Sequence, residues 1–550
     1  MPDPSIVRRV LADRPFAEVG EPRVAVADER LERLVVGGDM GWIAWPHSGR
    51  AGIERPPRYR VGVYDARDLR CRQVHDCPWP VDSVAFHPLL PLVAVGVGRY
   101  DGSWDFEGQL LLMDLQSGDV RPVLDGGREV VSVQWLDERR LRLVVTPEDK
   151  DYEYAFSHGF ESVLEREDWR AVPARSVGYR EVMGPRVPYA YPAGGDARDL
   201  LAERGAALGA AWAPRRQVRA VEVLADGRVL ATAEGALLEC RLPSGELQWS
   251  VPDPDGGQQI HVAADQRSAW VNVRHTLRPS GQGWQRSGTL VQRVSLADGG
   301  LLEAIEPGHA VTFTGSRDGR LAVRRGGPDQ PGGETRLLAP DGTETARFPL
   351  TASDFRLRRG AELLFVRDLH GVPRGRAWVG ALVGGEPGAE PGAEPALRGL
   401  FALDWENGRG SHLFPGPAVQ LDGTALVQAA VVRDDEETLA RNAFVVRRRL
   451  PDGAPEWVFA ADEPVTALDA DEDTVYAAHR SGEVVLLDAR TGSPRGRHRL
   501  HVDGQVVVPL SLAAAGAGRL LVGTVDGRIL DCDTAPPSAS ADPAVTSAGG

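Results

Sequence analysis

The sequence contains few cysteines and almost no lysine. Its four cysteines, Cys71, Cys77, Cys240 and Cys532, form no CxxC pair, and its first residues lack the continuous apolar core of a secretory signal. Scattered cysteines without such a signal are typical of a reducing compartment, so we expect a cytoplasmic protein. Lys150 is the one clear lysine in a composition rich in Ala, Arg, Gly and Pro, which suggests a GC-rich bacterial genome.

Long apolar runs and an excess of basic charge are also absent. No stretch of roughly 18 apolar residues occurs, so the chain is not expected to cross a membrane. The formal net charge is −15, with acidic and basic residues interspersed. This balance argues against nucleic acid as the main partner, because phosphate binding requires a basic surface. The run Arg447-Arg448-Arg449 does not change it, and we expect these arginines at a solvated strand end.

Sequence motifs of catalysis are missing as well. We find no GxSxG, no HExxH, no GxxxxGK[ST] and no convincing GxGxxG after a strand. We therefore expect no enzyme, no cofactor, and neither catalytic nor metal-binding residues. Cys71, His75 and Cys77 could be three metal ligands, but no fourth is evident nearby and structural zinc needs four. The alternating aspartates of Asp469–Asp473 fit a hairpin turn better than a calcium loop.

What the sequence does contain is a repeated pattern of short strands. In Val81–Leu124, the segment Val81–Phe86 alternates, Leu92–Val97 is almost continuously apolar, Gln109–Leu115 ends at a turn signal, and Val120–Leu124 follows. Four short antiparallel strands joined by Gly, Asp and Ser turns form one blade of a β-propeller. One blade cannot bury both of its faces alone, so this stretch predicts further blades.

Two families of repeats are similar to this pattern. SVAFHP resembles the opening of a WD40 repeat, and LLLMDLQSG resembles its third strand and the turn after it. LECRLPSGELQW, in the unit that begins at Val218, resembles a quinoprotein (PQQ)-like repeat. The resemblance implies an all-β fold, a β-propeller of four-stranded antiparallel blades that acts as a rigid interaction platform without catalysis. His87, where WD40 repeats usually carry Ser, is expected to be structural.

About ten blade-like units can be counted in the sequence. They form one large ring or two propellers, because a single ring usually has about four to eight blades. A Pro-rich insertion separates two sets of blades and contains one predicted helix, Asp196–Trp212, capped by Asp196. The expected parts are an N-terminal segment that could close the ring (1–22), a first set of blades (23–165), the insertion (166–217), a second set of blades (218–533) and a disordered tail (534–550).

The longest connections lie between the second and third strands of most units, which in a propeller emerge on one face. Function generally sits on loops that a rigid scaffold holds, and these loops are rich in the aromatic and charged residues of interface hot spots. Alternatively, the aromatics only pack the loops against each other. The loop Arg367–Leu397 contains the low-complexity EPGAEPGAEPA and is expected to be a flexible excursion. The predicted partner-binding residues are Trp45, Arg58, Tyr100, Trp104, Asp105, Phe106, Tyr152, Tyr154, Phe156, His158, Trp284 and Arg286.

We therefore predict a non-catalytic protein-interaction scaffold or adaptor that binds one or more proteins through this long-loop face. Its setting in a bacterial multi-protein regulatory or defence complex follows from the resemblance alone. Two alternatives stay open. A propeller hydrolase of the lactonase type would need acidic or His residues at several inner strand starts, where we find only Asp82 and Glu222. A small-molecule or glycan-binding propeller would use the Trp- and Tyr-rich loops.

Overall fold

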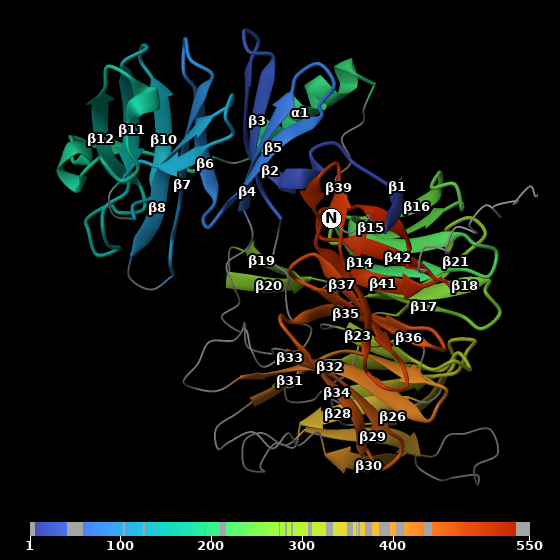
Figure 1. Cartoon of the computed structure of the whole chain (residues 1–550). Helices are drawn as coiled ribbons and strands as arrows, with labels where there is room; N and C mark the ends of the chain where they lie inside the picture. Colours follow the sequence, from blue (N-terminus) through green and yellow to red (C-terminus); the bar gives the residue numbers. More distant parts are fainter. Residues whose placement is uncertain are drawn as a thin grey trace, which may run out of the picture.

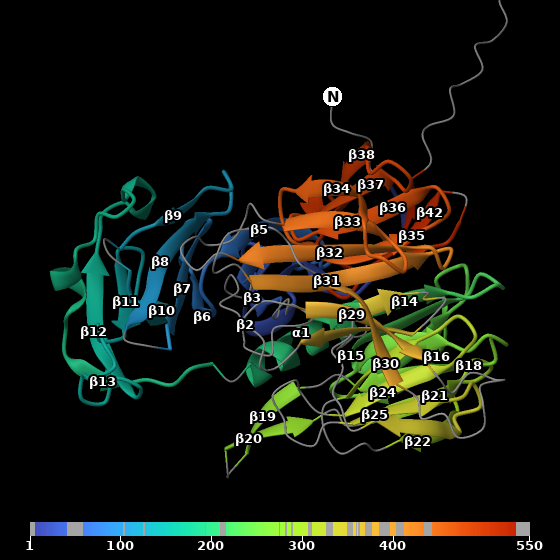
Figure 2. The same ribbon diagram turned by 90° about the horizontal axis from the view of Figure 1, so that it is seen from below.

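The chain folds into two bodies that consist almost entirely of antiparallel β-sheet. A lobe of three sheets is coloured blue to teal in Figure 1, and a ring of seven sheets follows from green to red. Figure 2 shows the same two bodies side by side after a 90° turn. The structure is a computed structural model that describes residues 6–40, 59–102, 105–124, 127–192, 194–209, 216–273, 276–280, 283–287, 290–305, 311–325, 334–348, 356–358, 360, 363–368, 377–383, 396–402, 412–433, 443–516 and 518–534.

The lobe contains three four-stranded sheets, and each sheet keeps its strands in chain order. The first strands of the three sheets contact one another in succession. The second strand of the middle sheet, β7 (Leu92–Tyr100), is nearly continuously apolar and buried because a neighbouring sheet covers each face. The lobe strands are β2 (Glu21–Asp28), β3 (Arg33–Asp39), β4 (Tyr59–Asp65), β5 (Cys71–Cys77), β6 (Val81–Phe86), β7 (Leu92–Tyr100), β8 (Phe106–Asp114), β9 (Val120–Pro122), β10 (Val130–Trp135), β11 (Arg140–Val145), β12 (His158–Glu165) and β13 (Arg186–Pro188).

The ring contains seven sheets arranged around a common centre. Its innermost strands contact each other in the order β14, β17, β23, β27, β31, β35 and β41, and β41 in turn contacts β14, which closes the ring. Its elements in chain order are β1 (Val7–Ala12), β14 (Arg216–Val223), β15 (Val229–Arg241), β16 (Leu247–Asp253), β17 (Gly257–Val262), β18 (Ser268–Val273), the hairpin β19 (Thr276–Ser280) and β20 (Gly283–Ser287), β21 (Val291–Ser295), β22 (Leu301–Ile305), β23 (Val311–Gly315), β24 (Leu321–Arg325), β25 (Glu334–Leu338), β26 (Glu344–Phe348), β27 (Arg356–Arg358), β28 (Leu364–Asp368), β29 (Ala377–Val383), β30 (Ala396–Ala402), β31 (His412–Leu421), β32 (Ala425–Arg433), β33 (Ala443–Arg449), β34 (Pro455–Ala461), β35 (Val465–Ala470), β36 (Thr474–His479), β37 (Glu483–Asp488), β38 (Pro494–Arg499), the hairpin β39 (His501–Val502) and β40 (Gln505–Val506), β41 (Pro509–Ala514), β42 (Arg519–Thr524) and β43 (Ile529–Asp533).

The two ends of the chain meet in the last sheet of the ring. Strand β1 pairs antiparallel with β43, so this sheet has the order β1-β43-β42-β41. The buried carboxylate of Asp531 accepts hydrogen bonds from Arg8 (2.7 Å), Arg9 (2.9 Å) and Arg519 (2.8 Å). Pairing of the ends in this way gives the last sheet four strands and removes two free strand edges.

The lobe is an open array, and its two end faces differ. On the first sheet, the far face is buried by the linker after β1, which includes the 3-10 turn η1 (Ala17–Val19), and by helix α1 (Gly195–Ala207). Phe16 and Leu201 pack there against Leu34 and Tyr64.

The far face of the third sheet is polar instead. Arg142 donates hydrogen bonds to Glu161 (2.7 Å) and to Gln134 (3.4 Å), and Val163 beside them is 48% exposed. A polar outer face is what a terminal unit of a repeat array needs for solubility.

A wedge of irregular chain fills the space between the second and third sheets at their outer edge. It contains the 3-10 turns η2 (Trp169–Ala171) and η3 (Tyr179–Val182). Trp169, Val177 and Val182 are buried in the core that these two sheets share. The indole Nε1 of Trp169 donates to the carbonyl of Arg139 (2.9 Å), and the Val177 amide donates to the carbonyl of Val123 (3.1 Å). The wedge therefore ties both sheets together.

A buried ionic cluster joins the lobe to the ring. Arg528, between β42 and β43, is 3% exposed and donates to Asp13 (2.8 Å), to Asp526 (2.9 Å) and to Glu18. Glu18 also accepts a hydrogen bond from the hydroxyl of Tyr64 on β4 of the lobe (3.1 Å). One arginine of the ring is therefore bonded to the linker and, through Glu18, to the lobe.

The structure corrects several predictions on the organisation of the chain. The all-β propeller architecture with about ten blade-like units is confirmed, and these units divide into one closed ring of seven and an open lobe of three, where we expected one large ring or two propellers. The predicted boundary at residue 165 divides a sheet, because β13 completes the third sheet of the lobe. Helix α1 begins after Gly194 and ends at Ala207, so Asp196 lies in its first turn and does not cap it, and Leu208 beyond it is 46% exposed. The predicted end at Trp212 lies outside the described residues.

Two further predictions are wrong. Strand β29 lies inside the stretch Arg367–Leu397 that was expected to be one long loop, and it pairs with β28 and β30. Arg448 is 5% exposed and donates to the carbonyl of Gly453 (3.0 Å), so the run of three arginines is not wholly solvated. Its neighbours on β33 point to the opposite side of the sheet, where Arg447 binds Glu456 (2.7 Å). No helix of the described residues is both long and apolar enough to span a membrane.

Candidate functional site

Two loops at one end of the lobe pair with each other. The first connects β7 to β8, and the second connects β11 to β12. Asp105 and Asp149 form an isolated antiparallel bridge between the loops, and the Phe106 amide donates to the carbonyl of Glu148 (3.3 Å). Because both loops leave rigid sheets at the same end, their side chains are held on one face.

The second loop is held in place by its own hydrogen bonds and by a later segment. Asp149 accepts hydrogen bonds from the amides of Asp151 (3.0 Å) and Tyr152 (3.1 Å). The hydroxyl of Tyr189, just after β13, donates to the carbonyl of the buried Ala155 (2.9 Å). The loop is therefore a built structure, in which aromatic side chains keep fixed positions.

Aromatic rings of both loops form a cluster. The ring centroids of Tyr100, Phe106 and Phe156 lie 5.1–5.3 Å apart, a range in which aromatic pairs attract each other. Phe156 is 56% exposed, whereas Phe106 is only 2% exposed. The structure thus corrects the prediction for Phe106: it supports the cluster from below, because the paired loops cover it, and it does not face a partner.

Tyr152 and Tyr154 extend the exposed aromatic surface. They are 42% and 53% exposed, and their rings pack on Phe160 and His158, with centroids 5.4 Å apart in both cases. Tyr154 has a φ of 65°, in the left-handed region that bulky residues rarely adopt. Such backbone strain costs about 1–3 kcal/mol and is concentrated at functional sites. A large exposed ring on a strained backbone is difficult to explain by loop packing alone.

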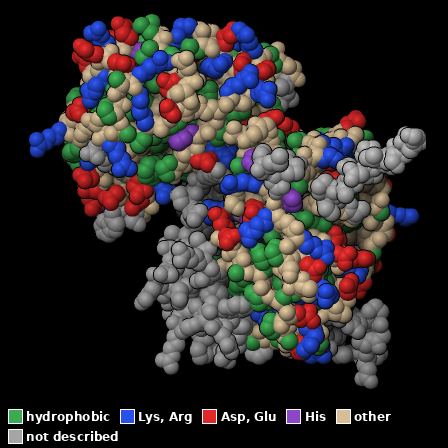
Figure 3. All heavy atoms as spheres, in the orientation of Figure 1, with side chains coloured by type: hydrophobic (Ala, Val, Ile, Leu, Met, Phe, Trp, Pro, Cys, Tyr) green, Lys and Arg blue, Asp and Glu red, His purple; other side chains and the backbone are tan. Residues whose placement is uncertain are grey.

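The aromatic surface is surrounded by carboxylates. Asp101, Asp105, Asp149, Asp151 and Glu153 are all exposed. Figure 3 shows Asp and Glu side chains gathered at the lower left of the lobe, at the end where β8 and its loops lie in Figure 1. The face is therefore both aromatic and acidic. We call residues 100–102, 105–107 and 147–158 together the acidic–aromatic face.

Two buried carboxylates lie at the same strand ends. Glu129, which is fully buried just before β10, accepts a hydrogen bond from the hydroxyl of Tyr191 (3.0 Å), and Asp82 on β6 binds Arg23 (3.2 Å). Burial, and then the negative charge of Asp82, raise the pKa of Glu129 to about 8. Burial, partly offset by Arg23, raises the pKa of Asp82 to about 7.

The other predicted site residues do not all belong to this face. Trp45, Arg58 and Trp104 lie outside the described residues. Trp284 and Arg286 lie on β20, in a hairpin of the ring that connects β18 to β21. The described residues predicted for one long-loop face therefore lie partly on the lobe and partly on the ring.

Sequence reasoning missed Glu129, Tyr189, Tyr191 and Arg186. The last three lie in the Pro-rich segment that we interpreted as an insertion between blades. Their contacts reach back over more than 30 residues to the second loop and to Glu129. No local sequence signal announces such contacts.

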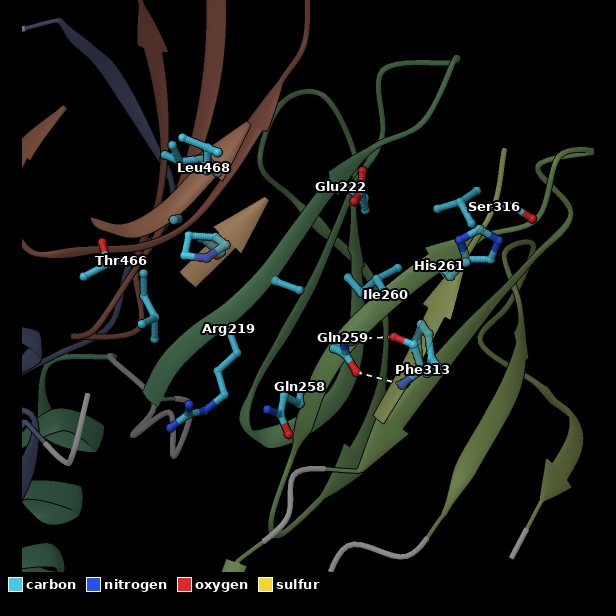
Figure 4. Close-up of a pocket in the computed structure, with 18 of the residues that line it drawn as sticks. Arg219, Glu222, Gln258, Gln259, Ile260, His261, Phe313, Ser316, Thr466 and Leu468 are labelled. Carbon is cyan, nitrogen blue, oxygen red and sulfur yellow. Dashed lines mark hydrogen bonds between the residues drawn. The ribbon is translucent and has the colours of Figure 1, made fainter. Parts of the chain in front are cut away.

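The ring has a cavity at its centre of about 350 Å³. The innermost strands line it, as Figure 4 shows for residues of β14, β17, β23 and β35. The side chain of Gln259 binds both backbone groups of Phe313 (3.2 Å each), which joins β17 to β23 across the wall. Burial lowers the pKa of His261 to about 4, so this side chain is neutral at pH 7. The cavity wall is thus mixed, apolar and neutral polar, with Arg219 and Glu222 as its charged groups on β14.

The two acidic residues considered for a hydrolase lie in different bodies. Asp82 is on β6 of the lobe, and Glu222 is on β14 and lines the cavity of the ring. Within the part of the chain that the structure describes, no three His, Cys, Asp or Glu side chains are grouped so that they could hold a metal ion. Asp471 accepts hydrogen bonds from the amides of Asp473 (3.1 Å) and Thr474 (2.8 Å), which confirms the hairpin turn.

Comparison with known proteins finds distant structural likeness alone. No family model and no curated protein matches the sequence. Among solved structures, the WD40 β-propeller domain of Doa1 has a TM-score of 0.37 at 10% identity, over 57% of this chain and 92% of that domain. The C-terminal WD40 domain of Sif2 has a TM-score of 0.36 at 10% identity, over 58% of this chain and 97% of that domain. Similarity at this level carries no function, and the assignment as an all-β propeller rests on the order and closure of the sheets.

Proposed function

We propose that the chain is a non-catalytic protein-interaction scaffold or adaptor and that the acidic–aromatic face of its lobe is the partner site. We place it with propellers of WD40-like and quinoprotein-like repeats, of bacterial type and in the cytoplasm, within a multi-protein regulatory or defence complex. The observation that carries the proposal is the exposure of Tyr152, Tyr154 and Phe156 on the loop between β11 and β12, which is hydrogen-bonded internally and paired with the loop between β7 and β8. Rigid exposed aromatics are the side chains that most often anchor protein interfaces.

The proposal is tested by affinity purification of the tagged chain from its own host, followed by mass spectrometry. A variant with Tyr154→Gly and Phe156→Ser removes two exposed rings. Glycine also relieves the positive φ at position 154, so the fold is expected to tolerate this exchange. We expect a stoichiometric partner with the natural chain and its loss with the variant.

A matched control removes exposed apolar side chains from the ring. Leu301 and Leu302 on β22 are 59% and 58% exposed, close to Tyr154 and Phe156 at 53% and 56%. Leu301→Ser with Leu302→Ser should leave the partner bound. Loss of the partner in this control alone, with retention in the loop variant, would move the site from the lobe to the ring.

A second proposal is a small-molecule ligand in the ring, favoured by the central cavity of about 350 Å³. Its size is in the range of sites that bind small ligands, roughly 300–1,000 Å³. A thermal-shift screen of metabolites would support it if a hit were lost in a Gln259→Leu variant. The lobe variant described above should then keep the hit, since its changes lie in another body.

A further inference from the structure

We propose that the acidic–aromatic face binds an arginine-bearing segment of its protein partner, with guanidinium groups seated between carboxylates and aromatic rings. This inference rests on the proposed function and specifies the chemistry of the partner. Two independent features support it: the excess of negative charge on this face, and two arginines of the chain itself that are bound there in this way.

The charge of the face is strongly one-sided. Residues 100–107 contain three carboxylates and residues 147–158 contain four, against Lys150, the only lysine of the chain, and three arginines that pair with Glu107, Glu148 and Glu153. Two of these carboxylates, on Asp105 and Asp151, are exposed and form no ion pair among the described residues. Like charges that are held this close repel each other, and a cationic partner would relieve the repulsion.

Arg186 shows how a guanidinium fits. It comes from β13, and its Nη1 lies 3.8 Å from a carboxylate oxygen of Glu153. Its Cζ lies 5.1 Å from the ring centroid of Tyr154, within the range of a cation–π contact. The strained Tyr154 and the exposed Glu153 therefore already form one seat for an arginine.

Arg128 repeats this arrangement at the neighbouring edge. Its Nη2 lies 3.2 Å from Glu148, and its Cζ lies 3.9 Å above the ring of Tyr179. Both arginines therefore combine a carboxylate with a tyrosine ring. Tyr152 and Phe156 remain as exposed rings beside Asp151 and Asp105, and no arginine lies over either ring among the described residues. They offer room for guanidiniums from a partner.

Residues 535–550 are not expected to supply the occupant. They contain no arginine, no lysine and no aromatic residue. They offer none of the groups that the face would bind. Arginine is favoured over lysine because its planar guanidinium both stacks on rings and binds carboxylates in a bidentate manner.

The test is fluorescence anisotropy with the full chain and a fluorescein-labelled peptide of alternating arginine and glycine. A lysine–glycine peptide and a glutamate–glycine peptide of equal length are the comparison probes. We expect binding of the arginine peptide that weakens with added salt, about threefold weaker binding of the lysine peptide, and none of the glutamate peptide. Equal binding of arginine and lysine peptides would overturn the role of the rings.

Charge-neutral variants locate the binding. Asp105→Asn with Asp151→Asn should weaken the binding of the arginine peptide by about three- to tenfold. The control, Glu472→Gln with Asp503→Asn, removes the same net charge from exposed positions of the ring. An equal loss in both variants would mean attraction to the whole acidic protein and would overturn the inference.

The two proposals fail in different ways. If binding of the natural partner depends on Tyr154 and Phe156 but the arginine peptide does not bind, the inference is overturned and the scaffold function stands. If the loop variant still binds the natural partner, the placement of the scaffold function on this face is overturned. Both proposals are supported if Tyr154→Gly with Phe156→Ser abolishes binding of the arginine peptide and the ring control, Leu301→Ser with Leu302→Ser, retains it.

Discussion

The lobe consists of four-stranded sheets and the ring of sheets with three to five strands, and the two bodies cover the faces of their sheets differently. In the ring, every sheet has a neighbour on each side, and β1 completes the last sheet by pairing with β43. In the lobe, three sheets leave two end faces. Helix α1 and the linker bury one, and Arg142, Glu161 and Gln134 make the other polar. Closure makes a ring depend on all its sheets, whereas an open array depends on a few specific contacts at its ends.

This difference also separates the roles that we assign to the two bodies. The ring contributes a fixed frame and a small central cavity. The lobe, joined to it by the cluster around Arg528, presents the aromatic rings and carboxylates to solvent. The following predictions test the comparison, beginning with the largest expected effect.

Replacement of Arg528 should break the joint between the bodies. Arg528→Ala leaves Asp526 and Glu18 in a buried place without their cation, a loss that costs about 3–5 kcal/mol. We expect chemical denaturation to resolve separate transitions for lobe and ring. Arg8→Ala, which removes an exposed partner of Asp531, is the control and should leave a single transition. Identical denaturation curves for both variants would contradict the view that Arg528 joins the two bodies.

Removal of the Trp169 side chain should destabilise the lobe alone. This fully buried indole fills the wedge between the second and third sheets. Trp169→Ala should lower the free energy of unfolding of the lobe by about 3–5 kcal/mol. Hydrogen exchange should speed up in β10–β12 and stay unchanged in β35–β38. Equal acceleration in both bodies would show that they unfold as one unit.

The buried carboxylates should make the lobe less stable as the pH rises. The folded pKa of Glu129, about 8, exceeds its ordinary value of 4.5, so the folded lobe holds this proton more tightly than the unfolded chain. The stability that Glu129 contributes is therefore fully present below pH 4.5 and is lost as the pH rises from 4.5 to 8. At 1.36 kcal/mol per pKa unit, even half of this pKa shift corresponds to ~2 kcal/mol of folding stability.

Glu129→Gln should remove most of this pH dependence, as measured by urea denaturation at several pH values. Asp82 contributes in the same direction up to about pH 7. The exposed carboxylate of Glu148 lies at the same end of the lobe, and Glu148→Gln should leave the slope unchanged. A natural chain whose stability rises over this range would contradict the burial argument.

The smallest effect on stability is expected at the polar end face. Arg142→Val with Glu161→Val would give the third sheet of the lobe an apolar face next to Val163, and such faces associate. Light scattering should show concentration-dependent dimers. The control is Arg336→Val with Glu334→Val in the ring. It should leave the degree of association as it is in the natural chain, because neighbouring sheets flank that sheet.

Local sequence pattern predicted the individual sheets well. Within Val81–Leu124, the strands β6 to β9 lie close to the predicted segments, because alternation and turn residues act over a few positions. The structural role of His87 is confirmed: its Nδ1 accepts from the amides of Leu89 (3.1 Å) and Leu90 (2.9 Å), and its Nε2 binds the carbonyl of Glu138 (2.9 Å).

Contacts between distant segments could not be predicted in this way. The division into a closed ring and an open lobe depends on how sheets pack, which no single repeat encodes. The same holds for the wedge around Trp169 and for Tyr191 on Glu129, which is 62 residues away in sequence. For the site, composition identified the aromatic loops of the lobe, whereas the burial of Phe106 and the contacts of Arg186 required the fold.

The most direct test of the account is hydrogen exchange of the chain bound to the partner captured from its host. We predict slower exchange in residues 100–107 and 147–158 of the lobe, with little change in the ring. Slower exchange confined to β14, β17 and β35 around the central cavity, with the lobe unchanged, would contradict it and assign the interaction to the ring.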